Sequence, residues 1–284
     1  MAGESMIYPR SNRADGAAVA AHYDELDRFY RTVWGTHLHH GYWQSGDEST
    51  EEAILNLSRL VATLARITAG SRVCDFGCGY GATARFFAQE YGAHVTGMTI
   101  SRRQHELAQN MAGENVDFLL GDGLDNHLPA CSFDALVAIE SSEHIGDKPA
   151  FFQEAQRLLR PGGRLVVAAW LAREQATPFE ARFLLEPICA EGRLPSMATA
   201  SEYLAMFKAG GFRDPEFADL SRNVRKTWSI CAYRLIKTIG SNAELRRALL
   251  QRDWGNHVFA RTVFRIWLAY RTGSMRYGVF SATK

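Results

Sequence analysis

Strand-like and helix-like patterns of hydrophobic residues alternate along the middle of the chain. Short apolar runs predict strands, and the segments between them carry apolar residues at helical spacing. Short links between alternating strands and helices favour right-handed crossovers, so we expect a parallel sheet with helices on both faces. The predicted strands are RVCDF (72–76), HVTGMTI (94–100), VDFLLGD (116–122), SFDALVAIE (132–140) and RLVVAAW (164–170). The predicted helices cover 82–92, 101–113 with Ser101 as N-cap, and 148–163 with Pro161 as its stop.

Mostly helical segments flank this alternating region. Residues 1–14 are polar and expected to be disordered, and an N-terminal helical cover is expected over 15–67. After Trp170 the alternation ends, and helical patterns over 171–211 and 223–275 predict a lid. Strands predicted over 215–221 and 275–284 complete a mostly parallel, seven-stranded sheet. We expect the last strand at the sheet edge and a single α/β domain over 15–284.

Composition and charge exclude several classes of protein. The 284 residues are 46% hydrophobic and 22% charged, as in an ordinary globular protein, and the formal net charge is +1. This net charge gives no reason to expect binding to nucleic acid or to an anionic membrane. The longest apolar run, 165–172, is too short to span a bilayer, and the polar N-terminus lacks a signal-peptide core. Five scattered cysteines favour a reducing compartment, so we expect a cytoplasmic protein without stable membrane insertion.

A glycine-rich loop follows the first strand of the alternating region. In CDFGCGYGATA, the residues Gly77, Cys78, Gly79 and Gly81 form a loop that lets a ligand approach the backbone closely. A Walker phosphate loop would need Gly-Lys-Ser/Thr, which does not follow here. A dinucleotide site usually has an acid at the end of the second strand, where this chain has GMTIS. By itself the loop does not identify its ligand.

Three acids at strand ends narrow the choice of ligand. Asp75 precedes the glycine loop, Asp122 ends the third strand and Glu140 ends the fourth, so all three are expected in one crevice. This layout suits S-adenosylmethionine. The glycines would admit its methionine part, Asp122 would accept from the adenine amino group, and Gly123 would leave room for the ring. A nicotinamide cofactor stays an alternative, and any single acid could instead be a strand-end cap.

From about residue 22 to the C-terminus, the chain resembles S-adenosylmethionine-dependent class I methyltransferases. It most resembles the γ-tocopherol methyltransferase-like group, which is remotely related to cyclopropane-fatty-acid synthases and sterol C-methyltransferases. The matching stretches are HYDELDRFYRTVWGTHLHHGYW, VCDFGCGYGATA, HVTGMTIS, SSEHIGDK, LRPGGRLVV, DLSRNVRKTW and RYGVFSATK. The resemblance implies a Rossmann-like methyltransferase fold, with S-adenosylmethionine as the cofactor.

The resemblance also implies roles for further residues around the cofactor. In this group the second strand ends in a turn like GMTIS, so Thr99, Ile100 and Gln104 would take over contacts to the ribose or the carboxylate. Tyr23 would close over the cofactor from the N-terminal segment, and His40 with Gly41 would approach it.

Cyclopropane synthases hold a bicarbonate with a glutamate and with a histidine just after the fifth strand. This chain has Glu143 in the corresponding SSEH stretch, but VVAAWLA replaces the histidine-bearing segment. We therefore do not expect cyclopropanation.

Candidate proton acceptors flank the expected crevice. Glu143 and His144 follow the fourth strand, and His40 is a rival from the N-terminal loop, which also holds His37 and His39. A base is needed only if the acceptor loses a proton. Each of these residues could instead have only a structural role, as an acid at a helix start or as a residue that packs within a loop. We expect no metal, because neither the histidines nor Asp122 with Asp125 complete a ligand set.

Aromatic residues of the lid imply an apolar acceptor pocket, although any single ring could be helix core. They are Phe179, Phe183, Tyr203, Phe207, Trp228, Tyr233, Trp254, Trp267 and Tyr270. We therefore expect a methyltransferase for a small apolar acceptor such as a prenylated aromatic, a terpenoid or an alkaloid-like metabolite. Carbon methylation by in-line displacement is preferred, with nitrogen or oxygen methylation next. A nicotinamide-dependent oxidoreductase and a non-catalytic binding protein are the alternatives of other classes, and a homo-oligomer stays open.

Overall fold

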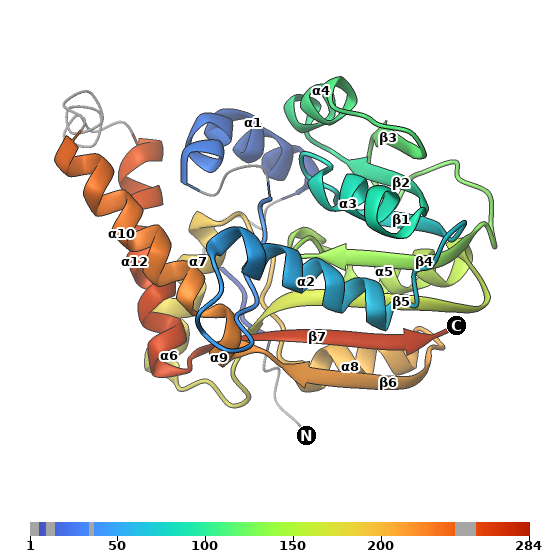
Figure 1. Cartoon of the computed structure of the whole chain (residues 1–284). Helices are drawn as coiled ribbons and strands as arrows, with labels where there is room; N and C mark the ends of the chain where they lie inside the picture. The colour runs from blue at the N-terminus through green and yellow to red at the C-terminus, as the bar shows by residue number, and fades with distance from the viewer. Residues whose placement is uncertain (1–5, 10–14, 34–36, 242–253) are drawn as a thin grey trace.

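The computed structural model describes residues 6–9, 15–33, 37–241 and 254–284. Its centre is a seven-stranded sheet with the order β3-β2-β1-β4-β5-β7-β6 (Figure 1). Strand β7 runs antiparallel to β5 and β6, and all the other neighbouring pairs are parallel, so the sheet is mostly parallel as predicted. The strands are β1 (Arg72–Phe76), β2 (His94–Thr99), β3 (Val116–Leu120), β4 (Phe133–Ile139), β5 (Leu159–Ala172), β6 (Arg213–Asp219) and β7 (Met275–Thr283).

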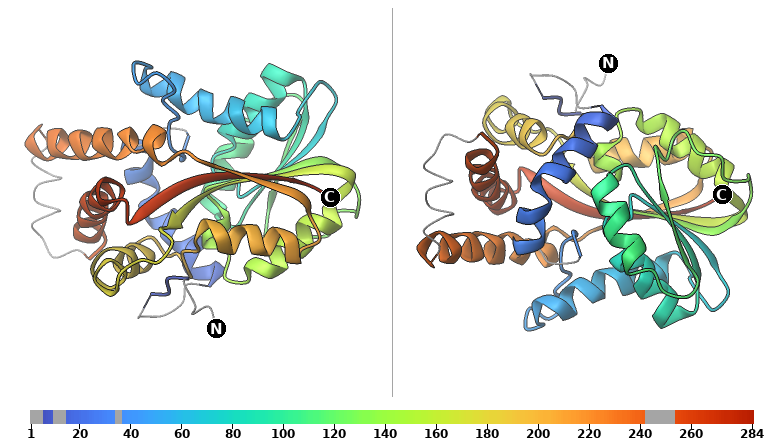
Figure 2. Two further views of the ribbon diagram at one scale, coloured as in Figure 1. Left: turned by 90° about the horizontal axis from the view of Figure 1, so that it is seen from below. Right: turned by 90° about the horizontal axis from the view of Figure 1, so that it is seen from above.

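Helices cover both faces of the sheet, as the views along its edge show (Figure 2). One face carries α2 (Thr50–Leu64) and α3 (Ala82–Tyr91), and the opposite face carries α5 (Lys148–Leu158) and α8 (Ala200–Ala209). Phe87 of α3 belongs to the hydrophobic core on the first side. Phe152 of α5 and Phe207 of α8 belong to the core on the other. Residues 73–76 of β1 are all buried, which is the pattern of a strand covered on both faces.

Helix α1 (Gly16–Val33) lies over the end of the sheet and contacts α4 (Arg102–Asn110). Beyond that end lie the remaining helical elements, which we call the lid (Figures 1 and 2). They are α6 (Pro178–Glu180), the π-helical turn η2 (Ala181–Leu185), α7 (Glu186–Glu191), α9 (Ser221–Val224), α10 (Lys226–Ser241) and α12 (Trp254–Thr272). A further 3₁₀ turn, η1 (Ser142–His144), follows β4.

The structure differs from the sequence-based expectations at several elements. Helix α5 ends at Leu158, before Pro161, because β5 already pairs with β4 from Leu159. Strand β7 is not at the edge: it lies between β5 and β6, and the exposed β6 forms the edge instead. The reason is that β7 is almost wholly buried and needs a partner on each side.

Two segments outside the central sheet also lie elsewhere than expected. Helix α8, expected within the lid, packs on the sheet with its buried Tyr203 and Phe207. Ile7, expected in a disordered segment, is buried and pairs through its backbone with Met197. The rest of residues 1–14, apart from 6–9, lies outside the described residues.

Candidate cofactor and acceptor site

A cavity opens at the carboxyl ends of the parallel strands, where the strand order reverses between β1 and β4. Open α/β sheets bind their ligands in this crevice. Its empty volume is about 1190 Å³ with the mouth included, which is enough for a nucleoside-sized cofactor and a small acceptor. All the expected cofactor residues line it except Gly81. Those lining it are Tyr23, Asp75, Gly77, Cys78, Gly79, Thr99, Ile100, Gln104, Asp122, Gly123 and Glu140.

The three glycines of the loop differ in what their missing side chains allow. All have positive φ, and Gly79 (φ 55°) lies against open space, since a Cβ there would meet only Leu38 at 3.8 Å. A Cβ at Gly81 would lie 2.2 Å from the ring of Phe118. Gly79 thus keeps the cavity open, whereas Gly81 is required for packing, which explains its absence from the lining.

Asp75 carries the clearest sign of a missing partner. It lies on β1, is buried, and its Oδ2 atom has no hydrogen-bond partner in the described part of the protein. Burial raises the pKa of Asp75 to about 7. An ammonium or sulfonium group in the cavity would supply the missing positive charge.

The turn after β2 is held by side-chain hydrogen bonds. The Thr99 hydroxyl donates to Gln104 Oε1 at 2.8 Å, and Ser101 caps α4 by accepting from the Gln104 backbone at 3.0 Å. The Ser101 hydroxyl in turn donates to Asp24 of α1 at 2.5 Å. This turn, which lines the cavity through Thr99, Ile100 and Gln104, is therefore linked to the position of α1.

Asp122 is exposed at the cavity rim, where a carboxylate oxygen accepts from the Leu124 backbone at 2.9 Å. Asp125 continues the same turn by donating its N–H to the Asp122 carbonyl. Gly123 has another reason than the one expected from the sequence: a Cβ there would lie 2.2 Å from the Phe76 ring. Phe76, which packs there, also lines the cavity.

Tyr23 of α1 and His144 of η1 meet in the cavity lining. The Tyr23 hydroxyl and His144 Nε2 form a hydrogen bond of 2.9 Å. Burial lowers the pKa of His144 to about 4, so the imidazole is neutral at physiological pH and one ring nitrogen can accept a hydrogen bond. This pair is the strongest candidate for proton transfer.

Two further histidines of the N-terminal loop also line the cavity. His37 Nδ1 lies 3.3 Å from His39 Nε2, and Thr83 is 3.2 Å from the same nitrogen. His39 Nδ1 donates to the His40 carbonyl, so His39 Nε2 is the accepting atom. Burial lowers the pKa of both imidazoles, that of His37 to about 3.

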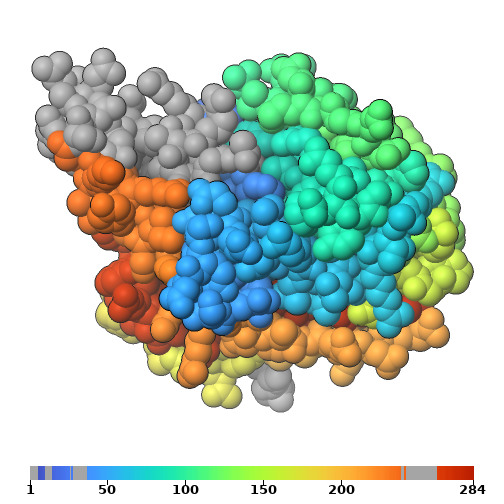
Figure 3. Space-filling model, viewed as in Figure 1, coloured from blue at the N-terminus to red at the C-terminus, as the bar shows by residue number. Residues whose placement is uncertain are grey.

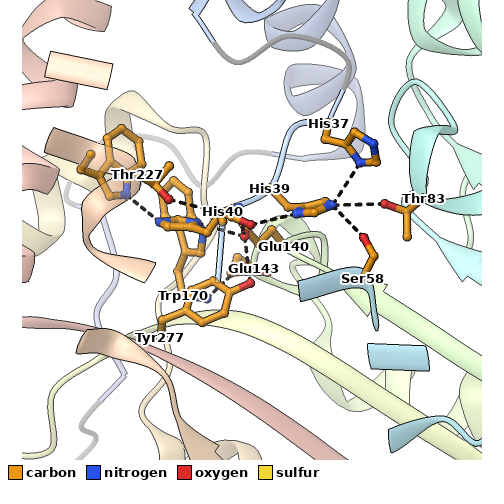
Figure 4. A network of polar contacts seen from close by, with 12 residues as sticks. His37, His39, His40, Ser58, Thr83, Glu140, Glu143, Trp170, Thr227 and Tyr277 are labelled. Atoms are coloured by element: carbon orange, nitrogen blue, oxygen red, sulfur yellow. Dashed lines mark hydrogen bonds and ion pairs between the residues drawn. The ribbon is translucent and has the colours of Figure 1, made fainter. Parts of the chain in front are cut away.

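Glu140 lines the cavity, but both of its carboxylate oxygens accept hydrogen bonds from protein groups (Figure 4). One carboxylate oxygen accepts from the His40 N–H, from His40 Nδ1 and from the Tyr277 hydroxyl, and the other accepts from the Trp170 indole. Burial alone would raise the pKa of Glu140, but the charge interaction and the hydrogen bonds with His40 outweigh burial and lower this pKa to about 2. Glu140 thus ties the N-terminal loop to β5 and β7.

His40 does not line the cavity, contrary to expectation. Both ring nitrogens are used, since Nδ1 contacts Glu140 and Nε2 accepts from the Trp228 indole at 2.6 Å. An indole N–H can only donate, so Nε2 has no free lone pair for a substrate. His40 is therefore buried and held by protein groups on both sides of its ring; Figure 4 shows these contacts.

The sequence analysis placed Glu143 beside the crevice, but the structure places it away from the cavity. It is buried and does not line the cavity, and its Oε1 accepts from the Trp170 backbone at 2.6 Å. Burial raises the pKa of Glu143 to about 8. Because η1 turns this side chain into the protein and His144 toward the cavity, only one of the two neighbours meets a ligand.

The lid aromatics do not line the cavity, at least for the eight whose side chains the structure describes. Tyr203 and Phe207 are core of the sheet, and Trp228 packs on His40 with ring centroids 5.7 Å apart. Phe179 and Phe183 are exposed to solvent. The side chain of Trp254 lies outside the described residues. Apolar lining comes instead from residues near the sequence motifs, such as Val19 of α1, Leu38 and Ile145.

The sequence analysis did not single out these apolar lining residues, although Leu38 lies in the WGTHLHHGYW stretch and Ile145 in the SSEHIGDK stretch. Val19 lies in the segment expected to form the N-terminal helical cover, and its side chain is buried. Among the residues described here, no group of three His, Cys, Asp or Glu side chains could hold a metal ion. Nor is any helix in those ranges long and apolar enough to cross a membrane.

The strand order, the glycine loop opening on free space and the unpartnered Asp75 oxygen define the class of protein. It is a class I methyltransferase that uses S-adenosylmethionine, and Asp75, the loop and the turn after β2 fit that cofactor. The family model for mycolic acid cyclopropane synthetase matches residues 10–271, so the chain belongs to that family. The resemblance inferred from the sequence is confirmed.

Named relatives agree with this assignment. The chain is 28% identical to the chloroplastic tocopherol O-methyltransferase of Arabidopsis thaliana, over 96% of this chain and 84% of that protein. It is 32% identical to the 27-O-demethylrifamycin SV methyltransferase of Amycolatopsis mediterranei, over 75% and 79% of the two chains. The structure of mycolic acid cyclopropane synthase CmaA1 with S-adenosylhomocysteine and CTAB shares the fold. That likeness has a TM-score of 0.83 at 24% identity, covering 96% of this chain and 99% of the other.

Proposed function

We propose that this enzyme transfers the methyl group of S-adenosylmethionine to a hydroxyl oxygen of a small apolar acceptor, with His144 and Tyr23 taking up the hydroxyl proton. The observation that carries the proposal is the hydrogen bond between Tyr23 and a neutral, cavity-lining His144. Relatives named for oxygen methylation support oxygen over the carbon atom preferred from the sequence.

The acceptor class follows from the lining. Val19, Leu38 and Ile145 offer apolar surface in the same cavity that Tyr23 and His144 line, so an acceptor with an apolar body that carries one hydroxyl fits it. Two relatives are named as a tocopherol O-methyltransferase and an O-methylkolavelool synthase. We propose the same general class here, without a metal ion.

The chain's own groups have two tasks. S-adenosylmethionine brings a methyl group already activated on a sulfonium, so the protein mainly orients the acceptor oxygen in line with it. As the new C–O bond forms, the bond between the methyl carbon and the sulfonium sulfur would break, S-adenosylhomocysteine would leave, and the acceptor hydroxyl becomes acidic. Its proton passes to the Tyr23 oxygen while the Tyr23 proton moves to His144 Nε2. A base with a low pKa suffices because the proton is released by a strongly acidic group.

The experiment incubates the enzyme with adenosylmethionine and a panel of hydroxylated apolar compounds, each beside its deoxy analogue. Mass spectrometry should detect products heavier by one CH₂ for the hydroxylated member only, and NMR should place the methyl on oxygen. His144→Ala should lower kcat about 10²–10⁴-fold. Methylation of carbon, or full kcat in both His144→Ala and Tyr23→Phe, would overturn the proposal.

A further inference from the structure

Exposed apolar side chains concentrate on the lid. In the described ranges eleven large hydrophobic side chains are exposed, and six of them lie on α6, η2, α10 and α12. Phe179 and Tyr233 are 66% and 65% exposed. The six, which we call the lid surface, are Phe179, Phe183, Tyr233, Ile236, Phe264 and Leu268.

Positive charge concentrates on the same helices. Helices α10 and α12 contain six Lys and Arg but no Asp or Glu, whereas the whole chain holds 32 Lys and Arg against 31 Asp and Glu. Two acids of the lid are paired with arginines, Glu180 with Arg173 and Glu191 with Arg265. The chain as a whole is therefore almost neutral, whereas the lid is basic.

Helical spacing puts the apolar and basic groups of α12 on one face. Arg261, Phe264, Leu268 and Arg271 recur every three or four residues and are exposed. On the opposite face, Val263, Ile266, Ala269 and Tyr270 are buried. This is an amphipathic helix whose outer face is both apolar and cationic.

The neighbouring elements extend this surface. On α10, Tyr233, Ile236 and Lys237 are exposed. The ring centres of Phe179 on α6 and Phe183 on η2 lie 4.8 Å apart, and the Arg182 guanidinium lies 5.5 Å from the Phe183 ring centre. Helix α12 contacts both α10 and η2, so the three elements form one end of the molecule (Figures 2 and 3).

We propose that the lid surface docks this enzyme on an anionic lipid bilayer. The aromatic and aliphatic side chains would enter the interface, while Lys237, Arg261 and Arg271 would contact lipid phosphates. A second copy of the chain fits less well, because a two-fold contact would bring this basic surface against itself. No membrane-crossing segment is needed for such peripheral binding.

Docking would also place helix α1, which covers the cavity, near the membrane. Helix α10 contacts α1, which supplies Val19 and Tyr23 to the cavity lining. This consequence rests on the proposed function: an apolar acceptor dissolved in the bilayer would then have a short path to the cavity.

The test is flotation of the full chain with vesicles of phosphatidylcholine alone or mixed with phosphatidylglycerol, without cofactor or acceptor. The protein should bind the mixed vesicles. Phe179→Ser with Phe183→Ser and Leu268→Ser should bind about tenfold more weakly. Lys237→Gln with Arg261→Gln should lose about tenfold on anionic vesicles only.

Matched controls come from exposed residues elsewhere. Leu119→Ser, Leu120→Ser and Phe217→Ser remove exposed apolar groups of β3 and β6, and Arg102→Gln with Lys208→Gln removes charges of α4 and α8. These variants should bind like the parent chain.

Three results would overturn the proposal: no binding to anionic vesicles, equal loss in the controls, or a lid variant that changes only self-association in sedimentation velocity. Because no methyl transfer is measured, failure here is distinct from failure of the proposed function.

Discussion

At the scale of single residues, the charge of Asp75 should have two opposite effects. It should lower the stability of the cofactor-free protein and strengthen cofactor binding. The pKa of Asp75 is raised from 3.8 to about 7, so between these values the native state holds a proton that the unfolded state has lost. The free energy of unfolding should therefore fall as pH rises from about 4 to 7, by up to about 4 kcal/mol. Asp75→Asn should remove this loss and stabilise the cofactor-free protein at pH 8, while weakening adenosylmethionine binding.

Chemical denaturation at pH 5 and 8 and calorimetry with adenosylmethionine measure the two effects of Asp75→Asn. A variant that is less stable at pH 8 but binds normally would contradict this role for Asp75.

Gly79 and Gly81 should respond differently to the same change. Gly79→Ala places a methyl group in the cavity at a strained φ, so it should abolish cofactor binding at a stability cost of about 1–2 kcal/mol. Gly81→Ala should unfold more easily, since its Cβ would overlap the Phe118 ring. Thermal melts and calorimetry separate the two, and equal stability of both variants would show that Phe118 gives way.

Glu143 and His144 are neighbours that the structure turns in different directions. Glu143→Gln should keep kcat within about threefold, because the amide can still accept from the Trp170 N–H and the side chain does not line the cavity. At saturating cofactor, kcat should need neutral His144 and thus decline only as pH falls toward about 4. Rate measurements from pH 5 to 8 test this, and a decline centred near pH 6.5 would point to an imidazole of ordinary pKa instead.

At the scale of elements, α1 is fastened over the cavity by two carboxylates. Asp24 accepts from the Ser101 hydroxyl at the start of α4, and Asp27 accepts from the Tyr80 hydroxyl at 2.6 Å. Asp24→Ala with Asp27→Ala should increase hydrogen exchange of the α1 amides and raise KM for adenosylmethionine about tenfold. Glu25→Ala, exposed on the same helix, is the control. Unchanged exchange in the double variant would show that α1 is held by its other contacts.

At the scale of the whole molecule, ligand binding should stabilise the entire fold, because the cavity joins β1, β2, β4 and α1. At a hundredfold excess over Kd, S-adenosylhomocysteine should add about 2.7 kcal/mol and raise Tm by roughly 5 °C. NAD should have no effect. Turnover should survive EDTA. A larger shift with NAD, or activity lost to EDTA and restored by Mg²⁺, would reopen the alternatives of cofactor and metal.

The sequence by itself determined the alternating strands and helices, the glycine loop and most of the cofactor lining. These features depend on local periodicity and on residues adjacent to strand ends, which short-range physics controls. Tyr23 and Gln104 were predictable only through the family resemblance, since nothing in their local pattern marks them.

Tertiary structure alone decided which polar residues face the cavity. Glu143 and His144 are adjacent, yet one is buried against Trp170 and the other meets Tyr23, because a 3₁₀ turn points successive side chains in different directions. His40 became a buried partner of Glu140 and Trp228, which lie 100 and 188 residues away in sequence. The net charge of +1 likewise gave no sign of the lid surface and the basic residues beside it. A net charge sums over the whole chain, whereas folding decides which charged and apolar side chains are exposed together.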